Sequence, residues 1–121
     1  MEKEGTALYK SKRFAVKVIR LYKLLCSRHR EYDLFRQVLR SGTSIGANLT
    51  EAGYAISRKD FLAKTYIALK ECAETAYWLE LLLETEYLSP QEYQSIAADC
   101  EELRKMLSST TKTLKQTTPH S

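Results

Sequence analysis

Residues that interrupt helices are scarce in this sequence, which has four glycines and two prolines among 121 residues. Runs of β-branched residues, which favour strands, are absent as well. Because glycine and proline mark tight turns and break helices, their scarcity disfavours a sheet with many turns and favours a few long helices. The length suits one domain with one continuous hydrophobic core.

Long hydrophobic runs are also missing. The most apolar stretch, AYWLELLL, is interrupted by Glu80 and is too short to span a bilayer. The first residues, MEKEG, are acidic and polar, unlike a secretory signal peptide. The sequence therefore predicts a soluble cytoplasmic protein with no membrane partner.

Cysteine and histidine are few and scattered. Cys26, Cys72 and Cys100 have no paired spacing, which argues against a disulfide framework or a zinc site and predicts buried thiols that act as small apolar residues. His29 and His120 fall in a predicted loop and a predicted tail, without a suitable serine or cysteine partner. We therefore expect no enzyme, with no catalytic residue, no metal and no cofactor.

Acidic residues are absent from one long stretch of the chain. Between Gly5 and Arg30 there are eight basic residues and no Asp or Glu. Between Phe61 and Leu88 five acidic residues outnumber two basic ones. One predicted helix is therefore cationic and another anionic, an asymmetry that the net charge of +4 conceals.

Four segments do show apolar residues at helical spacing, and they cover residues 9–27, 32–55, 57–87 and a fourth stretch from residue 89. Four long helices with short connections predict an all-α fold, an antiparallel up-and-down four-helix bundle. The expected organisation is a flexible N-terminus (1–8), one bundle domain (9–115) and a disordered C-terminal tail (116–121).

Local signals support two of the predicted helix starts. Ser57 with Asp60 suits a helix N-terminus, because serine caps the chain and the carboxylate favours the positive helix end. SPQE is stronger, since Ser89 and Glu92 form a capping box around Pro90 at the first helical position.

The stretch RSGTSIGANLTEAG looks like a loop, yet its apolar residues continue a helical stripe through the glycines. Gly42 lies on that stripe, where a missing side chain lets a neighbouring helix approach closely. A phosphate-binding loop is the rival interpretation, but no lysine follows Gly42 or Gly46 as its signature requires. The stretch is predicted to be helical.

The segments QVLRSGTSIGANLTEA, SRKDF, IALKECAETAYWLELL and YLSPQEY resemble the small four-helix-bundle proteins encoded by intervening sequences in bacterial large-subunit ribosomal RNA genes. The resemblance covers residues 9–115. The matching positions are Gln37, Arg40, Ser44, Ile45, Asn48, Glu51, Phe61, Ala68, Glu74 and Leu79. The sequence departs from the family at Leu39 (a common arginine), Gly46 (a usual proline) and Ala52 (a usual glycine); the lost arginine removes one candidate nucleic-acid contact.

The resemblance extends to the accessory variability protein of diversity-generating retroelements. It implies a homo-oligomer, a pentameric ring with a central channel, and for the retroelement branch binding to RNA and to a reverse transcriptase. Exposed apolar residues Tyr77, Trp78 and Leu81 of the third helix are the expected oligomer interface. The alternative for Trp78 is that it only covers the core of its own bundle.

Two hypotheses about function follow. In the first, an oligomeric, non-enzymatic bundle binds structured RNA or DNA through phosphates and acts as an adaptor for a reverse transcriptase or an RNA-processing event. The candidate contacts are Lys10, Lys12, Arg13, Lys17, Arg20, Lys23, Arg36 and Arg40. In the alternative, the protein is a protein–protein scaffold whose charges serve only helix pairing and ring assembly.

A second set of candidate residues is a polar network of Arg40, Asn48, Glu51 and Glu74. The two carboxylates are expected to approach one another across helices. Arginine and asparagine would then supply the partners that a buried carboxylate needs.

Overall fold

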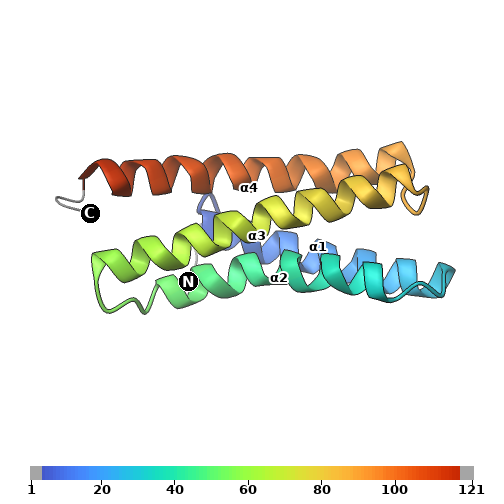
Figure 1. Ribbon diagram of the computed structural model, residues 1–121, viewed down its shortest axis with the longest axis horizontal. Helices are drawn as coiled ribbons and strands as arrows, with labels where there is room; N and C mark the ends of the chain where they lie inside the picture. The colour runs from blue at the N-terminus through green and yellow to red at the C-terminus, as the bar shows by residue number, and fades with distance from the viewer. Residues whose placement is uncertain (1–3, 118–121) are drawn as a thin grey trace.

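The computed structural model describes residues 4–117, which form four helices that lie along one common axis (Figure 1). The helices are α1 (Ala7–Arg28), α2 (Asp33–Ala52), α3 (Arg58–Glu84) and α4 (Pro90–Thr117). Consecutive helices run in opposite directions, and α1 and α4 close the bundle by packing against each other. Among the described residues, no Cα atom of α1 comes within 8 Å of one in α3, and the same holds for α2 and α4. The predicted all-α four-helix bundle is confirmed.

The predicted caps at the starts of α3 and α4 are confirmed. The Ser57 hydroxyl accepts a hydrogen bond from the Asp60 N–H at 3.0 Å. At α4 the Ser89 hydroxyl accepts from the Glu92 N–H at 3.1 Å, while the Glu92 carboxylate accepts from the Ser89 N–H at 3.0 Å. These bonds satisfy backbone donors that a helix N-terminus leaves without intrahelical partners.

The helix ends differ by a few residues from the predicted ones. α2 ends at Ala52, three residues before the expected end, and α3 ends at Glu84. α3 stops there because Glu86 adopts a left-handed backbone with φ 70°, a conformation that a sequence usually signals with glycine. α1 begins two residues earlier than predicted and α4 continues to residue 117. Residues 1–3 and 118–121, including His120, lie outside the described part of the chain.

Gly42 lies where α1 and α2 approach each other closely. A Cβ atom at this position would lie 2.9 Å from both methyl carbons of Val18, which is closer than real Cβ contacts allow. A Cβ at Gly46 would lie 3.2 Å from the Ser11 hydroxyl. The small-faced stretch is therefore a helix, as predicted, and its glycine allows close contact with α1.

The core consists of apolar side chains from all four helices. Its largest fully buried members include Phe35, Leu25, Ile45 and Leu79. Cys72 and Cys100 are buried free thiols, as predicted, whereas Cys26 is only half-buried. Within residues 4–117, no helix has the length and apolarity needed to cross a membrane.

Candidate nucleic-acid interface

The cations of α1 divide into two groups, one paired with carboxylates of α4 and one exposed without an acidic partner among residues 4–117. At about 100° per residue, Lys10, Lys17 and Arg28 share the side that faces α4, and we call them the inner row. The outer row points to solvent and contains Lys12, Arg13, Arg20 and Lys23, all of which are exposed. The sequence analysis took the cations of both rows together as candidate nucleic-acid contacts, and the structure divides them.

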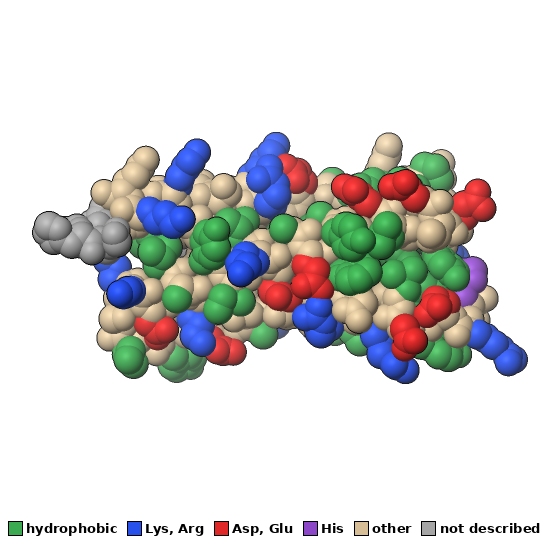
Figure 2. All heavy atoms as spheres, in the orientation of Figure 1, with side chains coloured by type: hydrophobic (Ala, Val, Ile, Leu, Met, Phe, Trp, Pro, Cys, Tyr) green, Lys and Arg blue, Asp and Glu red, His purple; other side chains and the backbone are tan. Residues whose placement is uncertain are grey.

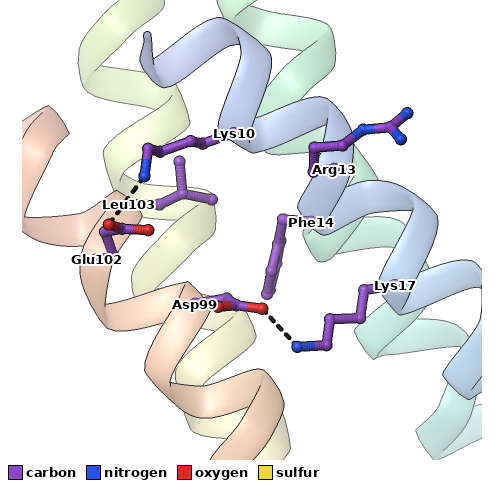
Figure 3. Close-up of a pocket in the computed structure, with 7 residues that line it drawn as sticks. All are labelled: Lys10, Arg13, Phe14, Lys17, Asp99, Glu102 and Leu103. Carbon is purple, nitrogen blue, oxygen red and sulfur yellow. Dashed lines mark hydrogen bonds and ion pairs between the residues drawn. The ribbon is translucent and has the colours of Figure 1, made fainter. Parts of the chain in front are cut away.

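The inner row is paired with carboxylates of α4. Lys10 Nζ lies 3.0 Å from Glu102 Oε2, and Lys17 Nζ lies 2.6 Å from Asp99 Oδ2. Figure 3 shows both ion pairs bridging the two helices. A third pair joins Arg28 to Glu92 at 3.0 Å, where α1 ends and α4 begins. The basic helix therefore finds its acidic partners on α4, and not on the acidic α3, which lies diagonally opposite.

A cleft of about 170 Å³ lies between α1 and α4. Lys10, Lys17, Asp99 and Glu102 line it, with Phe14 and Leu103 beneath them. Because its two lysines face two carboxylates, the cleft is electrically balanced. In Figure 3 the Arg13 side chain, which also borders the cleft, points away from both carboxylates.

The outer row has no acidic partner among residues 4–117. Arg13 lies over the Tyr9 ring, with its guanidinium carbon 5.9 Å from the ring centroid. From Lys12 to Lys23 the row extends about 16 Å along α1. That length matches several phosphates of a nucleic-acid strand, which carries one charge per about 3.4 Å.

Arg36 and Arg40, the predicted additions from α2, do not extend the outer row. Arg36 lies 3.3 Å from Asp33 of its own helix. Arg40 forms an ion pair with Glu74 and lies 3.8 Å from Glu71. Two carboxylates therefore surround the single charge of Arg40, which makes it a helix-pairing residue and a poor phosphate contact.

The predicted polar network separates into independent contacts. Glu51 pairs with Lys64 at 3.2 Å, Glu74 pairs with Arg40, and the Asn48 amide donates to the Ser44 carbonyl at 2.9 Å. The prediction that the carboxylates of Glu51 and Glu74 approach one another was wrong. The antiparallel register of α2 and α3 keeps them apart. Glu51 lies opposite the start of α3, whereas Glu74 lies opposite a position of α2 that is about 16 Å away.

The predicted oligomer interface on α3 is only partly exposed. Tyr77 is 55% exposed, but Trp78 and Leu81 are half-buried. Trp78 packs against the core, and its indole N–H donates to Glu74 at 2.9 Å. Much of the Trp78 side chain therefore covers the core of its own bundle, as the alternative interpretation predicted.

Other apolar residues of α3 are exposed that the sequence did not single out. Phe61, Tyr66 and Ile67 are each between 37% and 41% exposed. Figure 2 shows hydrophobic side chains gathered in separate groups on the side where α3 and α4 run next to each other. Tyr66 and Ile67 also line a shallow groove, over which Lys115 lies 4.9 Å from the centre of the Tyr66 ring.

The described residues offer little for catalysis. No group of three or more His, Cys, Asp and Glu side chains among them is arranged to hold a metal ion. His29 lies edge-on to the Tyr87 ring at 4.9 Å and to the Phe35 ring at 6.1 Å. These contacts make it a packing residue at one end of the bundle.

Comparison with known proteins gives a consistent result. Residues 3–109 match the family described as 23S rRNA-intervening sequence protein. The chain is also similar to the crystal structure of a protein with unknown function from the S23 ribosomal protein family of Bacteroides thetaiotaomicron. The two are 50% identical with a TM-score of 0.87, over 88% of this chain and 99% of that chain. No curated protein matches the chain.

Proposed function

Because the chain belongs to the 23S rRNA-intervening sequence protein family, we propose that it is a non-enzymatic helical bundle that binds structured RNA or DNA. Phosphates contact the outer row of α1. The observation that carries this proposal is the set of four exposed cations that lie on one side of a helix without acidic partners in residues 4–117. Such a surface attracts polyanions at a distance and releases counterions on binding.

The inner row contributes little to this binding. Lys10 and Lys17 would have to leave Glu102 and Asp99 before they could contact a phosphate. No side chain of the outer row is held in a fixed orientation by a second polar group. Binding therefore depends on the charge and shape of the nucleic acid and has little sequence specificity.

Assembly strengthens the same contact. The family resemblance implies a pentameric ring, and the exposed apolar side chains of α3 support an interface that includes Tyr77, Tyr66 and Ile67. Each additional copy brings another outer row, so a ring binds one polyanion at several points and gains avidity. In this proposal the ring is a cytoplasmic adaptor that presents nucleic acid to a reverse transcriptase or an RNA-processing enzyme.

The test compares two sets of neutral variants in a mobility-shift titration with a structured RNA at 50 mM salt. One variant carries Lys12→Gln, Arg13→Gln, Arg20→Gln and Lys23→Gln. The matched control carries Lys10→Gln, Lys17→Gln and Arg28→Gln, which removes a similar amount of charge from the same helix. We expect the outer-row variant to lose at least about 100-fold in affinity and the control to stay within about threefold of the native protein. Absence of binding by the native protein, or equal losses in both variants, contradicts the proposal.

A protein–protein scaffold remains the second candidate function. It is favoured by the pairing of the inner row and of Arg40 with carboxylates of neighbouring helices. The same variants separate the two functions when their mass is measured by light scattering. If the outer-row variant loses its oligomeric mass and the native protein never binds nucleic acid, the scaffold explains the charges.

A further inference from the structure

Two cysteines that are far apart in the sequence meet where α3 and α4 cross. Cys72 Sγ and Cys100 Sγ lie 3.9 Å apart in the buried core. The Cys72 thiol lies 3.3 Å from the Cys100 carbonyl oxygen, and the Cys100 thiol lies 3.4 Å from the Cys72 carbonyl oxygen. Each sulfur thus reaches both the side chain and the backbone of the other residue.

This reciprocal arrangement is close to what a disulfide requires. A disulfide brings its sulfur atoms to about 2.0 Å, and it forms only where the two backbones already lie near each other. Because each thiol touches the opposite backbone, α3 and α4 are in direct contact at this point. To form a disulfide, the sulfur atoms would have to move from 3.9 Å to bonding distance by rotation of the two side chains.

A groove connects one of the two cysteines to the surface. It has a volume of about 340 Å³, and Cys100 lines it together with Ala76, Tyr93 and Ala97. Cys72 does not line this groove. Glu80 and Glu101 also line it, so its entrance has no excess of positive charge that would attract an anionic oxidant.

The pKa values of the two thiols also differ, and like the groove they favour Cys100 as the reacting residue. The contact with the Cys72 thiol lowers the pKa of Cys100, whereas the contact with Cys100 and burial raise the pKa of Cys72. Cys100 is therefore the first of the pair to ionise, and the thiolate is the form that attacks an oxidant. The residue that lines the groove is therefore also the one that ionises first.

We propose that Cys72 and Cys100 form a modification site, at which a small neutral peroxide converts the two thiols into a disulfide between α3 and α4. The Cys100 thiolate attacks one peroxide oxygen, the O–O bond breaks, and hydroxide leaves and takes up a proton to become water. The resulting Cys100 sulfenic acid is attacked by Cys72, whose proton goes to the departing hydroxyl group as the S–O bond breaks. Overall the two thiols lose two electrons and two protons, and hydrogen peroxide is reduced to two molecules of water.

The disulfide would act on stability. It would join the middle of α3 to the middle of α4, at positions 28 residues apart. Closing a loop of this size restricts the unfolded chain, and we expect the melting temperature to rise by about 10 °C.

The test uses the full native chain treated with hydrogen peroxide and digested with trypsin without reduction. Residues 71–104 contain no internal lysine or arginine and no methionine, so one peptide holds both cysteines, and a loss of two hydrogen atoms from it reports their disulfide. We expect this peptide to become lighter by two hydrogen atoms and to regain them after treatment with a reductant. The peptide 24–28 holds Cys26 separately and serves as an internal control.

Two variants sharpen the result. In Cys72→Ala, Cys100 has no resolving thiol, so the peptide should instead gain oxygen atoms. Cys26→Ala should leave the loss of two hydrogen atoms unchanged, which excludes a disulfide between copies through that residue. The inference is overturned if the native peptide gains oxygen atoms without losing hydrogen, if both thiols stay unmodified, or if oxidised glutathione reacts as fast as the peroxide.

Discussion

The two sides on which α1 meets its neighbours are built by different means. Towards α2 the contact is apolar and tight, with Val18 against the bare backbone of Gly42. Towards α4 the packing is less extensive, and three ion pairs bridge the two helices. Partly exposed ion pairs of this kind contribute little free energy, whereas close packing contributes much.

The difference indicates that the α1–α2 contact and the α1–α4 contact have different roles. The contact with α2 fixes where α1 lies in the bundle. The contact with α4 neutralises the inner row, so that the cations of α1 left without an acidic partner are those of the outer row. In this account the ion pairs of α4 shape the charge of the surface more than they stabilise the fold.

The largest expected effect on stability comes from adding a side chain at the tight contact between α1 and α2. Gly42→Leu places a side chain against both methyl groups of Val18, and overpacking of this kind costs about 3 kcal/mol. Urea denaturation should show a lower midpoint with an unchanged slope. Gly53→Ala, at an exposed position at the end of α2, is the control and should have little effect. A Gly42→Leu protein as stable as the native one would show that the contact is not tight.

The role of Gly42 could be predicted from the sequence, since a glycine on an apolar stripe implies close helix approach. The division of the cations could not. Arg13, Lys17 and Arg20 lie near one another on a helical wheel, and only the position of α4 separates Lys17 from the other two. The contact between Cys72 and Cys100 likewise depends on the register between α3 and α4. The spacing of residues along the chain does not determine that register.

The stability supplied by the contact between α1 and α4 should fall in acid, by less than Gly42→Leu is expected to cost. Hydrogen bonding by the Ser89 N–H, together with Arg28, holds the pKa of Glu92 below its ordinary value. The ionised carboxylate therefore favours the folded state above about pH 4.3, and that stability is lost as the pH falls further.

Thermal melts at pH 6 and pH 3 should consequently differ more in the native protein than in Glu92→Gln. Glu84→Gln, an exposed substitution in α3, is the matched control and should melt like the native protein at both values. An equal pH response in Glu92→Gln and the native protein would remove Glu92 from the account of acid sensitivity.

The smallest effect on stability is expected for the cleft between α1 and α4. Asp99→Asn with Glu102→Gln removes both partners of Lys17 and Lys10, and exposed pairs of this type are worth less than about 1 kcal/mol each. The same variant frees two lysines, so its affinity for structured RNA should rise. Unchanged affinity together with a large loss of stability would reverse the roles assigned to the two sides of α1.

The most direct test of the central claim is the salt dependence of RNA binding, measured as the slope of log affinity against log salt concentration. Four phosphate contacts from the outer row predict a slope of about −3 to −4 for each bound copy of the native protein. Neutralising Lys12, Arg13, Arg20 and Lys23 should reduce the slope nearly to zero, and neutralising Lys10 and Lys17 should leave it almost unchanged. A native slope near zero, or a slope that depends on the inner row and not on the outer one, would contradict the account.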